Sequence, residues 1–488
     1  MENMTDDDTG SSSVEDLSER PKHPQNVRIS IDELQQDFAF IDWSKLMTLF
    51  SEVSGFEITE LLLDSKEYLD EMMGLFSRHR PRTIDNFFCW SSIARFMPYL
   101  GPQFRRLYTD FRREVPDLSS PGSEPKTESG RVFLSRWKEC VHLTCEGLKL
   151  PTSLLYLQHK HEYLDTSNHT ITTMIQNIKK AFHKIVDQQS WLPNEQTKQL
   201  LKERADKIGS KIGFPSFLRD PQEADKYYSS LRIEPADVFV SNIIKIARNE
   251  MVMELRKLNE TVDPDKEWLI QPLIANAYFD AANDYIILPA GILRFPLVSN
   301  RRPKFLDYST LGVVIGHEIA HSFDALTRKE SDANGDGNLT WWPSELDREY
   351  DNLTKCFVDQ FSSYVVASTG ENLNGNATLD ENLCDFAGFQ QSYAAFHSLG
   401  SSQVNYDQRL PGLQQFTVDQ LFFVQYAQMW CEVSSEDGHR KSVHDSHSPG
   451  RYRTIGIAVN SPQFGNVFDC PRGSPMNPID KCKLWIHS

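Results

Sequence analysis

The sequence has no run of apolar residues approaching the roughly 18 that a membrane-spanning helix needs, so no membrane span is predicted in this chain. Its N-terminus lacks the basic start and apolar core of a secretory signal peptide, and residues 1–26 are predicted to form a disordered acidic tail. Positive charge is scarce, because 51 Lys and Arg face 68 Asp and Glu, giving a net charge of −17. Such a surface repels phosphates, so nucleic acid is not an expected partner.

The eight cysteines include no Cys-x-x-Cys pair, which argues against a thiolate zinc finger. Eight is nevertheless a large number for a reduced enzyme without a metal cluster. Asn-x-Ser/Thr sequons are also present, and these can be glycosylated only in a secretory context. Cysteines and sequons therefore favour an oxidising compartment, whereas the N-terminus argues against one. The sequons are at Asn3, Asn168, Asn259, Asn338, Asn352 and Asn376.

The length of 488 residues predicts two or three lobes with sizeable cores. Residues 27–215 read mostly as helices, because apolar residues recur every three or four positions in stretches such as 170–186. Residues 119–125 are predicted to be a loop between two helical blocks. A stretch rich in proline and charge, 215–235, marks the expected boundary with a second lobe over 216–488.

The second lobe is expected to add a small β component to a mainly α protein. A helix is predicted over 237–258. Two short strands follow, at 276–279 and 284–289, joined by the polar turn 280–283.

The most informative motif is His317-Glu318-x-x-His321, which lies in an apolar run with helical spacing. Four residues apart on a helix, both imidazoles can reach one ion, with Glu318 beside it. Zinc accepts imidazole nitrogen and leaves a position for a reactive water molecule. The alternative is a buried helix with two ordinary histidines. The motif favours zinc peptidase chemistry.

A third ligand is expected downstream, where Glu381 and Asp385 share one face of a predicted helix. One carboxylate can bind zinc while the other accepts a hydrogen bond from the outer nitrogen of a ligating histidine. Taken alone, however, two acids at this spacing are usually solvated.

A loop at 332–340 imitates a calcium-binding loop, with oxygen-bearing side chains at alternate positions. Its twelfth position is Pro343, where a bidentate glutamate is needed. A tight surface turn is therefore preferred to a calcium site.

Several stretches, in this order along the chain, resemble the neprilysin family of zinc endopeptidases, which includes the endothelin-converting enzymes. The match covers essentially 27 to the C-terminus and is densest after 263. The stretches are Asn-Ala-Tyr-Phe from Asn276, Pro-Ala-Gly-Ile-Leu from Pro289, Gly-His-Glu-Ile-Ala-His-Ser-Phe-Asp from Gly316, Glu-Asn-Leu-Cys-Asp from Glu381, Ser-His-Ser-Pro-Gly-Arg-Tyr-Arg from Ser446, and Cys-Lys-Leu-Trp from Cys482.

The resemblance implies a thermolysin-like zinc catalytic lobe and a helical lid lobe, which would admit short peptides and exclude folded proteins. It implies one zinc ion per chain, held by His317, His321 and Glu381. Glu318 would act as general base and then as general acid. Asp385 would orient His317 from outside the ligand shell.

The same resemblance assigns residues to the substrate. His447 would stabilise the oxyanion, and Asp445 would orient His447. The residues implied to contact a peptide are Asn276 and Ala277 along its backbone, Arg453 at a carbonyl, and an apolar pocket formed by Ile292, Val314, Met429 and Trp430. Considered singly, His447, Arg453 and Asn276 would more often be ordinary surface or turn residues.

The sequence departs from the family pattern in two ways. The family's membrane anchor and its Pro-Cys-x-Asp-Phe-Tyr segment are not found, and that segment normally supplies part of the cleft and several half-cystines. The family pairing of Cys356 with Cys482 is implied, whereas the partners of Cys140, Cys431 and Cys470 would lie in the missing segment. Cys384 replaces a small alanine, so its sulfur could compete for zinc or could simply pack as a small buried group.

These observations predict a zinc-dependent endopeptidase that hydrolyses short peptides on the amino side of hydrophobic residues. The alternative is a catalytically silent or weak truncated relative that binds zinc and peptides. The resemblance places the protein outside the cell or at the plasma membrane, although no signal or anchor is visible in this chain.

Overall fold

The computed structural model of the chain describes residues 27–63, 65–114, 126–127, 130–131, 136–261, 263, 268, 271–325, 327–329 and 341–486. The predicted acidic tail at 1–26, the predicted loop at 119–125 and the calcium-like loop at 332–340 lie outside this part of the chain. The described residues are mostly helical with a few short strands, which confirms the predicted fold class. Their contacts divide the chain into two compact units: 1–98 with 251–260, and 99–250 with 261–488.

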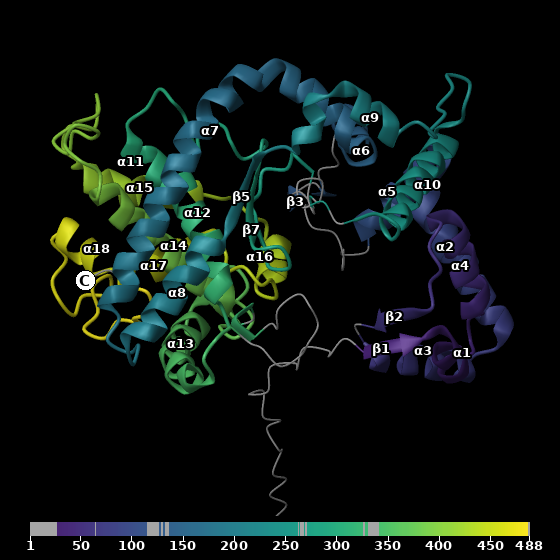
Figure 1. Cartoon of the computed structure of the whole chain (residues 1–488), viewed down its shortest axis with the longest axis horizontal. Helices are drawn as coiled ribbons and strands as arrows, with labels where there is room; N and C mark the ends of the chain where they lie inside the picture. Colours follow the sequence, from purple (N-terminus) through teal and green to yellow (C-terminus); the bar gives the residue numbers. More distant parts are fainter. Residues whose placement is uncertain are drawn as a thin grey trace, which may run out of the picture. The chain divides into compact units, whose positions relative to one another are not determined.

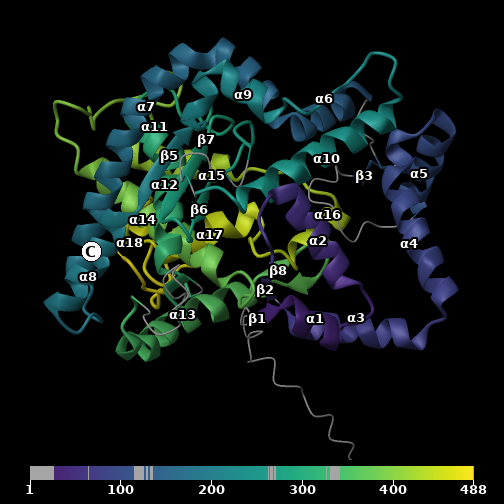
Figure 2. The same ribbon diagram turned by 45° about the vertical axis from the view of Figure 1, so that its right-hand side comes forward.

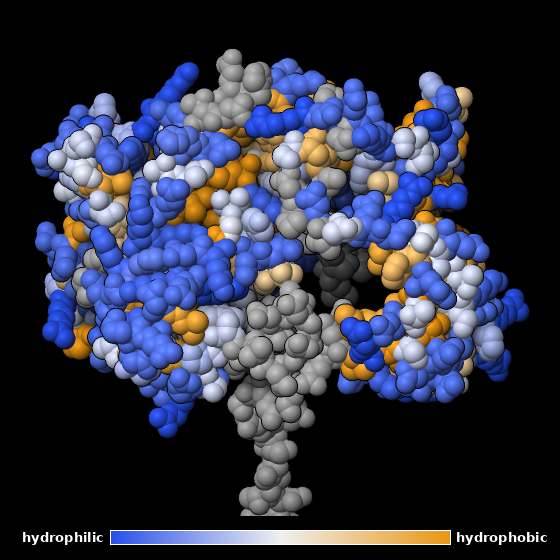
Figure 3. All heavy atoms as spheres, viewed as in Figure 1, coloured by the Kyte–Doolittle hydropathy of each residue, from blue (hydrophilic) through white to orange (hydrophobic). Residues whose placement is uncertain are grey.

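The first unit has a small core under a short antiparallel pair of strands. Ile29, Leu34, Phe38 and Leu69 are buried there. Ser30 accepts a hydrogen bond from the Glu33 N–H and so caps the first helix. Hydrophobic side chains also reach the surface of this unit, among them Phe87, Phe88 and Trp90 (Figure 3). Its elements are β1 Val27–Ser30, α1 Ile31–Asp37, α2 Trp43–Ser54, β2 Glu60–Leu63, α3 Lys66–Arg78 and α4 Pro81–Phe96.

The second unit contains the large core and every residue predicted to form the site. Its longer helices are α5 Pro102–Glu114, α6 Arg136–Gly147, α7 Lys149–Gln188, α8 Glu195–Lys207, α10 Phe239–Lys257 (which continues into the first unit), α12 Val313–Ala320, α13 Asp347–Ser362, α14 Leu379–His397, α15 Val418–Met429 and α17 Gly450–Asn460. Its shorter helices are α9 Pro221–Tyr227, α11 Lys304–Asp307, α16 Glu436–Ser442 and α18 Pro462–Val467. Its strands are β3 Lys126–Thr127, β4 Gly130–Arg131, β5 Gly209–Gly213, β6 Tyr278–Asp280, β7 Tyr285–Pro289, β8 Val365–Val366 and β9 Glu371–Asn372.

Two helices at the centre of this unit, α12 and α14, pack with their backbones in close contact, and α7 and α17 lie against α14 (Figures 1 and 2). Glycines at the crossing allow this approach. A Cβ atom on Gly388 would lie 2.5 Å from the backbone nitrogen of His317, and one on Gly316 would lie 2.8 Å from the Cα of Gly388. Any side chain at either position would therefore separate the helices that carry the predicted zinc ligands.

The predicted hairpin is present as β6 and β7, which pair antiparallel with Phe279 opposite Ile286. Asp280 stabilises the turn, because its carboxylate accepts hydrogen bonds from the backbone and side-chain N–H groups of Asn283. β5 completes the sheet by pairing in parallel with β7, giving the order β5-β7-β6. Among the described strands β6 therefore forms one edge of the sheet, and Asn276 and Ala277 directly precede it.

The lobe boundary expected at 215 stays a prediction, but the contacts divide the chain elsewhere. β5 precedes that boundary and pairs with β7, which follows it. α7 likewise packs on α14. Helix α10 closely matches the helix predicted over 237–258.

Cys356 on α13 is bonded to Cys482 near the C-terminus, which confirms the implied pairing. Of the described helices, none combines the length and apolarity needed to cross a membrane.

Candidate metal centre

Two imidazole rings face each other where α12 gives way to a tighter turn at His321–Phe323. The Nε2 atoms of His317 and His321 lie 3.1 Å apart. Their outer nitrogens are already used, since Nδ1 of His317 lies 2.9 Å from Asp385 Oδ1 and Nδ1 of His321 lies 2.9 Å from Asp324 Oδ2. A neutral ring that donates through Nδ1 carries its lone pair on Nε2. Two such lone pairs at this distance require a proton or a cation between them.

Glu381 on α14 supplies the third ligand atom. Its Oε2 lies 3.2 Å from His317 Nε2, and its Oε1 lies 3.8 Å from His321 Nε2. Zinc–ligand bonds of about 2.0–2.2 Å in a tetrahedron place ligand atoms roughly 3.3–3.5 Å from one another. The three observed separations, 3.1, 3.2 and 3.8 Å, scatter around that value. The donor set, two imidazole nitrogens and one carboxylate, fits zinc with an open fourth position.

The carboxylate of Asp385 is shared between two cationic or donor groups. It contacts His317 and accepts two hydrogen bonds from Arg453, from Nε at 2.5 Å and from Nη2 at 2.6 Å. Burial raises the pKa of Asp385, but the neighbouring Arg453 and His317 outweigh burial and hold that pKa below its usual value. Asp385 therefore stays ionised and accepts the His317 proton.

Arg453, on α17, is buried and lies over the ring of Trp430, with its guanidinium carbon 3.7 Å from the ring centroid. Its expected contact with a substrate carbonyl stays a prediction. The structure adds a second task, because this guanidinium fixes Asp385 and, through Asp385, the ring of His317.

Glu318 is buried beside the two histidines. Burial raises the pKa of Glu318, while His317 and His321 oppose this rise. A carboxylate with a raised pKa next to the open ligand position is suited to take and return a proton.

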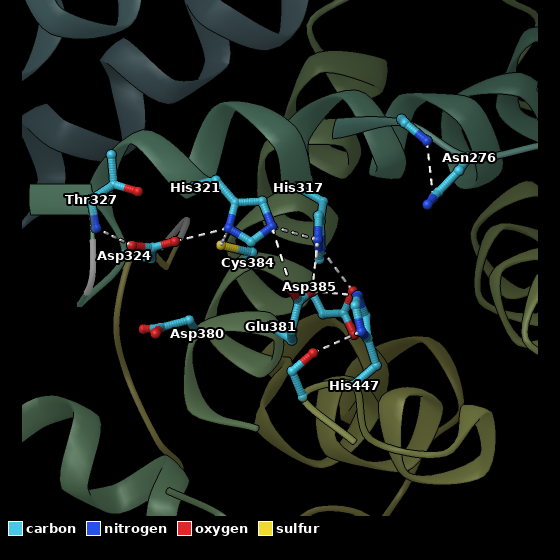
Figure 4. Close-up of polar contacts among 12 residues, drawn as sticks. Asn276, His317, His321, Asp324, Thr327, Asp380, Glu381, Cys384, Asp385 and His447 are labelled. Carbon is cyan, nitrogen blue, oxygen red and sulfur yellow. Dashed lines mark hydrogen bonds and ion pairs between the residues drawn. The ribbon is translucent and has the colours of Figure 1, made fainter. Parts of the chain in front are cut away.

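His447 lies in the loop between α16 and α17 and is half exposed. Its Nε2 is 3.0 Å from Glu381 Oε2, and this hydrogen bond raises the pKa of His447. Asp445 accepts a hydrogen bond from the His447 backbone N–H at 2.8 Å, and its Oδ1 is 3.3 Å from the ring Nδ1. The structure thus brings Asp445 to His447, as the sequence predicted, and aims the ring at the ligand cluster (Figure 4).

A cavity of about 730 Å³ opens onto these groups. The side chains predicted to form the apolar pocket all line it, together with both residues that precede β6. The predicted residues in its wall are Asn276, Ala277, Ile292, Val314, His317, Glu318, His321, Glu381, Asp385, Met429, Trp430, His447 and Arg453. Asp445 reaches the site through His447.

Two acidic residues in this wall were not assigned a role from the sequence. Asp324 holds His321 and also accepts a hydrogen bond from the Thr327 N–H at 2.7 Å. Asp380 accepts one from the Ala325 N–H at 2.9 Å and so ties the end of the histidine turn to α14. Asp324 could have been found, because it follows His321 by three residues within the quoted motif. Asp380 carries no such signal.

The sulfur of Cys384 does not face the Nε2 atoms. It is buried on α14 and lies 3.4 Å from Nδ1 of His321, on the same side of the ring as Asp324 (Figure 4). Of the two possibilities left open by the sequence, competition for the first ion is therefore not favoured by the geometry.

Comparison with family models gives two matches, both described as peptidase family M13. One covers residues 9–215 and the other residues 276–484. Among curated proteins, human endothelin-converting enzyme 1 is 31% identical over 490 residues, covering 99% of this chain and 61% of the human protein. Neprilysin-11 of Caenorhabditis elegans is 32% identical over 429 residues, covering 88% of this chain and 48% of the relative. The chain thus spans about half to three-fifths of the length of these two relatives.

Solved structures give the same result for the fold. The crystal structure of the Mycobacterium tuberculosis zinc metalloprotease Zmp1 with an inhibitor superposes with a TM-score of 0.78 at 25% identity, covering 94% of this chain and 66% of that one. PepO from Lactobacillus rhamnosis superposes with a TM-score of 0.74 at 21% identity, covering 94% and 67%.

Proposed function

Because the chain belongs to peptidase family M13, we propose that it is a zinc-dependent endopeptidase that hydrolyses short peptides on the amino side of hydrophobic residues. The observation that carries this proposal is the cluster of His317, His321 and Glu381, whose ligand atoms converge beside Glu318 in the wall of one cavity. The family and the donor set both imply zinc, and we propose one ion per chain.

When bound, zinc would supply Lewis acidity and lower the pKa of a water molecule to about 7. Glu318 would take the proton of the attacking water and return it to the leaving amine, a role that contributes typically 10²–10⁴-fold in rate. His447, whose pKa is raised by Glu381, would donate a hydrogen bond to the oxygen on which negative charge develops. Asp385 and Arg453 would keep His317 in the tautomer that leaves Nε2 available.

The cavity supports a preference for peptides with an apolar side chain after the cleaved bond. Ile292, Val314, Met429 and Trp430 provide an apolar wall close to Glu318. Asn276 and Ala277, placed just before an edge strand, would hold the peptide backbone as an added strand. This placement would run the peptide across the ligand cluster.

We also propose that the protein works in an oxidising compartment, outside the cell or at its surface. The Cys356–Cys482 disulfide supports this location. The sequon residues Asn168, Asn352 and Asn376 are all exposed, as glycosylation requires.

The proposal is tested by incubating the purified chain with a mixed peptide panel and identifying the products by mass spectrometry. We expect cleavage before apolar residues, with activity lost on chelation and restored by zinc. Turnover that survives the chelator would contradict the proposal. Binding of one zinc equivalent without any turnover would instead favour the alternative, a silent relative that binds zinc and peptides.

A further inference from the structure

A second group of metal-ligating atoms lies on the outer side of the His321 ring. Asp324 Oδ2 is 2.9 Å from Nδ1 of His321, and Cys384 Sγ is 3.4 Å from the same nitrogen. All three ligand atoms lie within 4.8 Å of one another. Figure 4 shows them at the edge of the ring opposite His317 and Glu381. The three residues come from two places in the chain, the turn after α12 and the interior of α14.

A thiolate, an imidazole and a carboxylate together favour soft or borderline divalent ions. In a tetrahedral site with bonds of about 2.1 Å to nitrogen and oxygen and about 2.3 Å to sulfur, the ligand atoms are roughly 3.4–3.6 Å apart. The sulfur–nitrogen distance of 3.4 Å already meets this geometry. The oxygen–nitrogen distance of 2.9 Å is that of a hydrogen bond, and it would have to open by about 0.5 Å to admit an ion.

We propose that His321 Nδ1, the Asp324 carboxylate and the Cys384 thiolate form a second metal position, selective for a thiophilic divalent cation such as Cd²⁺. An entry path exists, because His321, Asp324 and Thr327 line the same cavity as the first ligand cluster. Cys384 itself is 1% exposed, so an ion would reach it past Asp324. A purely apolar role at this position would not place the sulfur against a ring nitrogen.

Binding requires definite proton movements. The Cys384 thiol loses its proton to solvent, and the Asp324–His321 hydrogen bond is replaced by bonds from each residue to the ion. If Nε2 of His321 carries no metal, the ring proton moves from Nδ1 to Nε2. If Nε2 is occupied, the ring must lose that proton as well, so the two ions weaken each other's binding. Inhibition by soft metals would follow, and only this consequence rests on the proposed function.

The test uses Cd²⁺ alone as the probe and the full chain treated with chelator. Titration is followed by the ultraviolet charge-transfer absorbance of a cadmium–thiolate bond and by the number of ions bound. We compare the native chain with Cys384→Ala, with Cys384→Ser as a second variant if Ala does not fold. Cys431→Ala, which removes an exposed free thiol, is the matched control.

The native chain and Cys431→Ala should bind a second Cd²⁺ equivalent with the thiolate absorbance. Cys384→Ala should lose that absorbance and bind the second ion at least about tenfold more weakly, the low end of what losing a supporting group costs a metal site. The variant should keep the first equivalent, which has no thiolate ligand. Equal absorbance in Cys384→Ala, or no second equivalent in the native chain, would overturn the proposal. Neither readout depends on peptide turnover, so a silent enzyme would not be mistaken for a missing site.

Discussion

Oδ1 of Asp385 lies 2.9 Å from Nδ1 of His317, and both side chains are buried. The carboxylate therefore decides which nitrogen of the ring carries the proton. Replacing Asp385 with Asn should lower zinc affinity by about 10–100-fold, the usual cost of losing a partner that orients a ligating histidine. Zinc competition with a chromophoric chelator measures this. The control is Asp359→Asn, since Asp359 is exposed on α13, and equal affinities for the two variants would refute the assigned role.

Arg453 is the second partner of Asp385, and the pair is buried. Arg453→Met should destabilise the fold by about 3–5 kcal/mol, because the carboxylate would be left in the interior without its cation. Chemical denaturation measures the difference in the free energy of unfolding. Arg348→Gln, at an exposed position of α13, should stay within about 0.5 kcal/mol. A loss below about 1 kcal/mol for Arg453→Met would mean that water or His317 compensates the charge.

Zinc uptake should release protons at neutral pH. Burial lowers the pKa of His317, but hydrogen bonds to Asp385 and Glu381 outweigh it and raise that pKa to about 10. In chelator-treated protein the charged ring stabilises the fold below the unfolded pKa of about 6.5, and this contribution is lost as the pH rises towards 10. Zinc needs the neutral ring, so its affinity should rise by up to about tenfold per pH unit over the same window.

Calorimetric titration with zinc in buffers of different ionisation enthalpy measures this proton release directly. A zinc affinity that stays constant between about pH 7 and pH 9 would contradict the raised pKa of His317.

The disulfide between Cys356 and Cys482 closes a loop across 126 residues. Its removal in the double variant Cys356→Ala/Cys482→Ala should cost about 2–5 kcal/mol, because the unfolded chain regains the freedom that the cross-link removes. The midpoint of thermal unfolding reports the loss. Cys89→Ala, which removes an exposed free thiol, should leave the midpoint unchanged; an equal fall in both variants would point to the thiols rather than the cross-link.

Local sequence patterns predicted the elements that carry the site. The apolar spacing around His317 and the spacing of Glu381 and Asp385 identified α12 and α14. The polar turn at 280–283 identified the β6–β7 hairpin, because turn residues between alternating apolar runs are a short-range signal. Such predictions depend only on neighbours in the sequence.

Features that depend on distant contacts were not predicted. β5 pairs with β7 across more than 70 residues, and nothing local to 209–213 indicates that partner. The contact of Gly316 with Gly388 and the approach of Cys384 to His321 arise only when α12 and α14 pack. The pairing of Arg453 with Asp385 was missed for the same reason. Side-chain chemistry could be predicted from the motif, but its wiring required the packed structure.

The most direct test of the central claim is peptide turnover by Glu318→Gln, with zinc content determined on the same sample. Glu318 is buried at the ligand cluster without being one of the three ligands. The account predicts that the variant keeps its zinc and its fold while turnover falls by about 10²–10⁴-fold, the usual contribution of a general base. A variant that retains zinc and cleaves peptides at the native rate would contradict it.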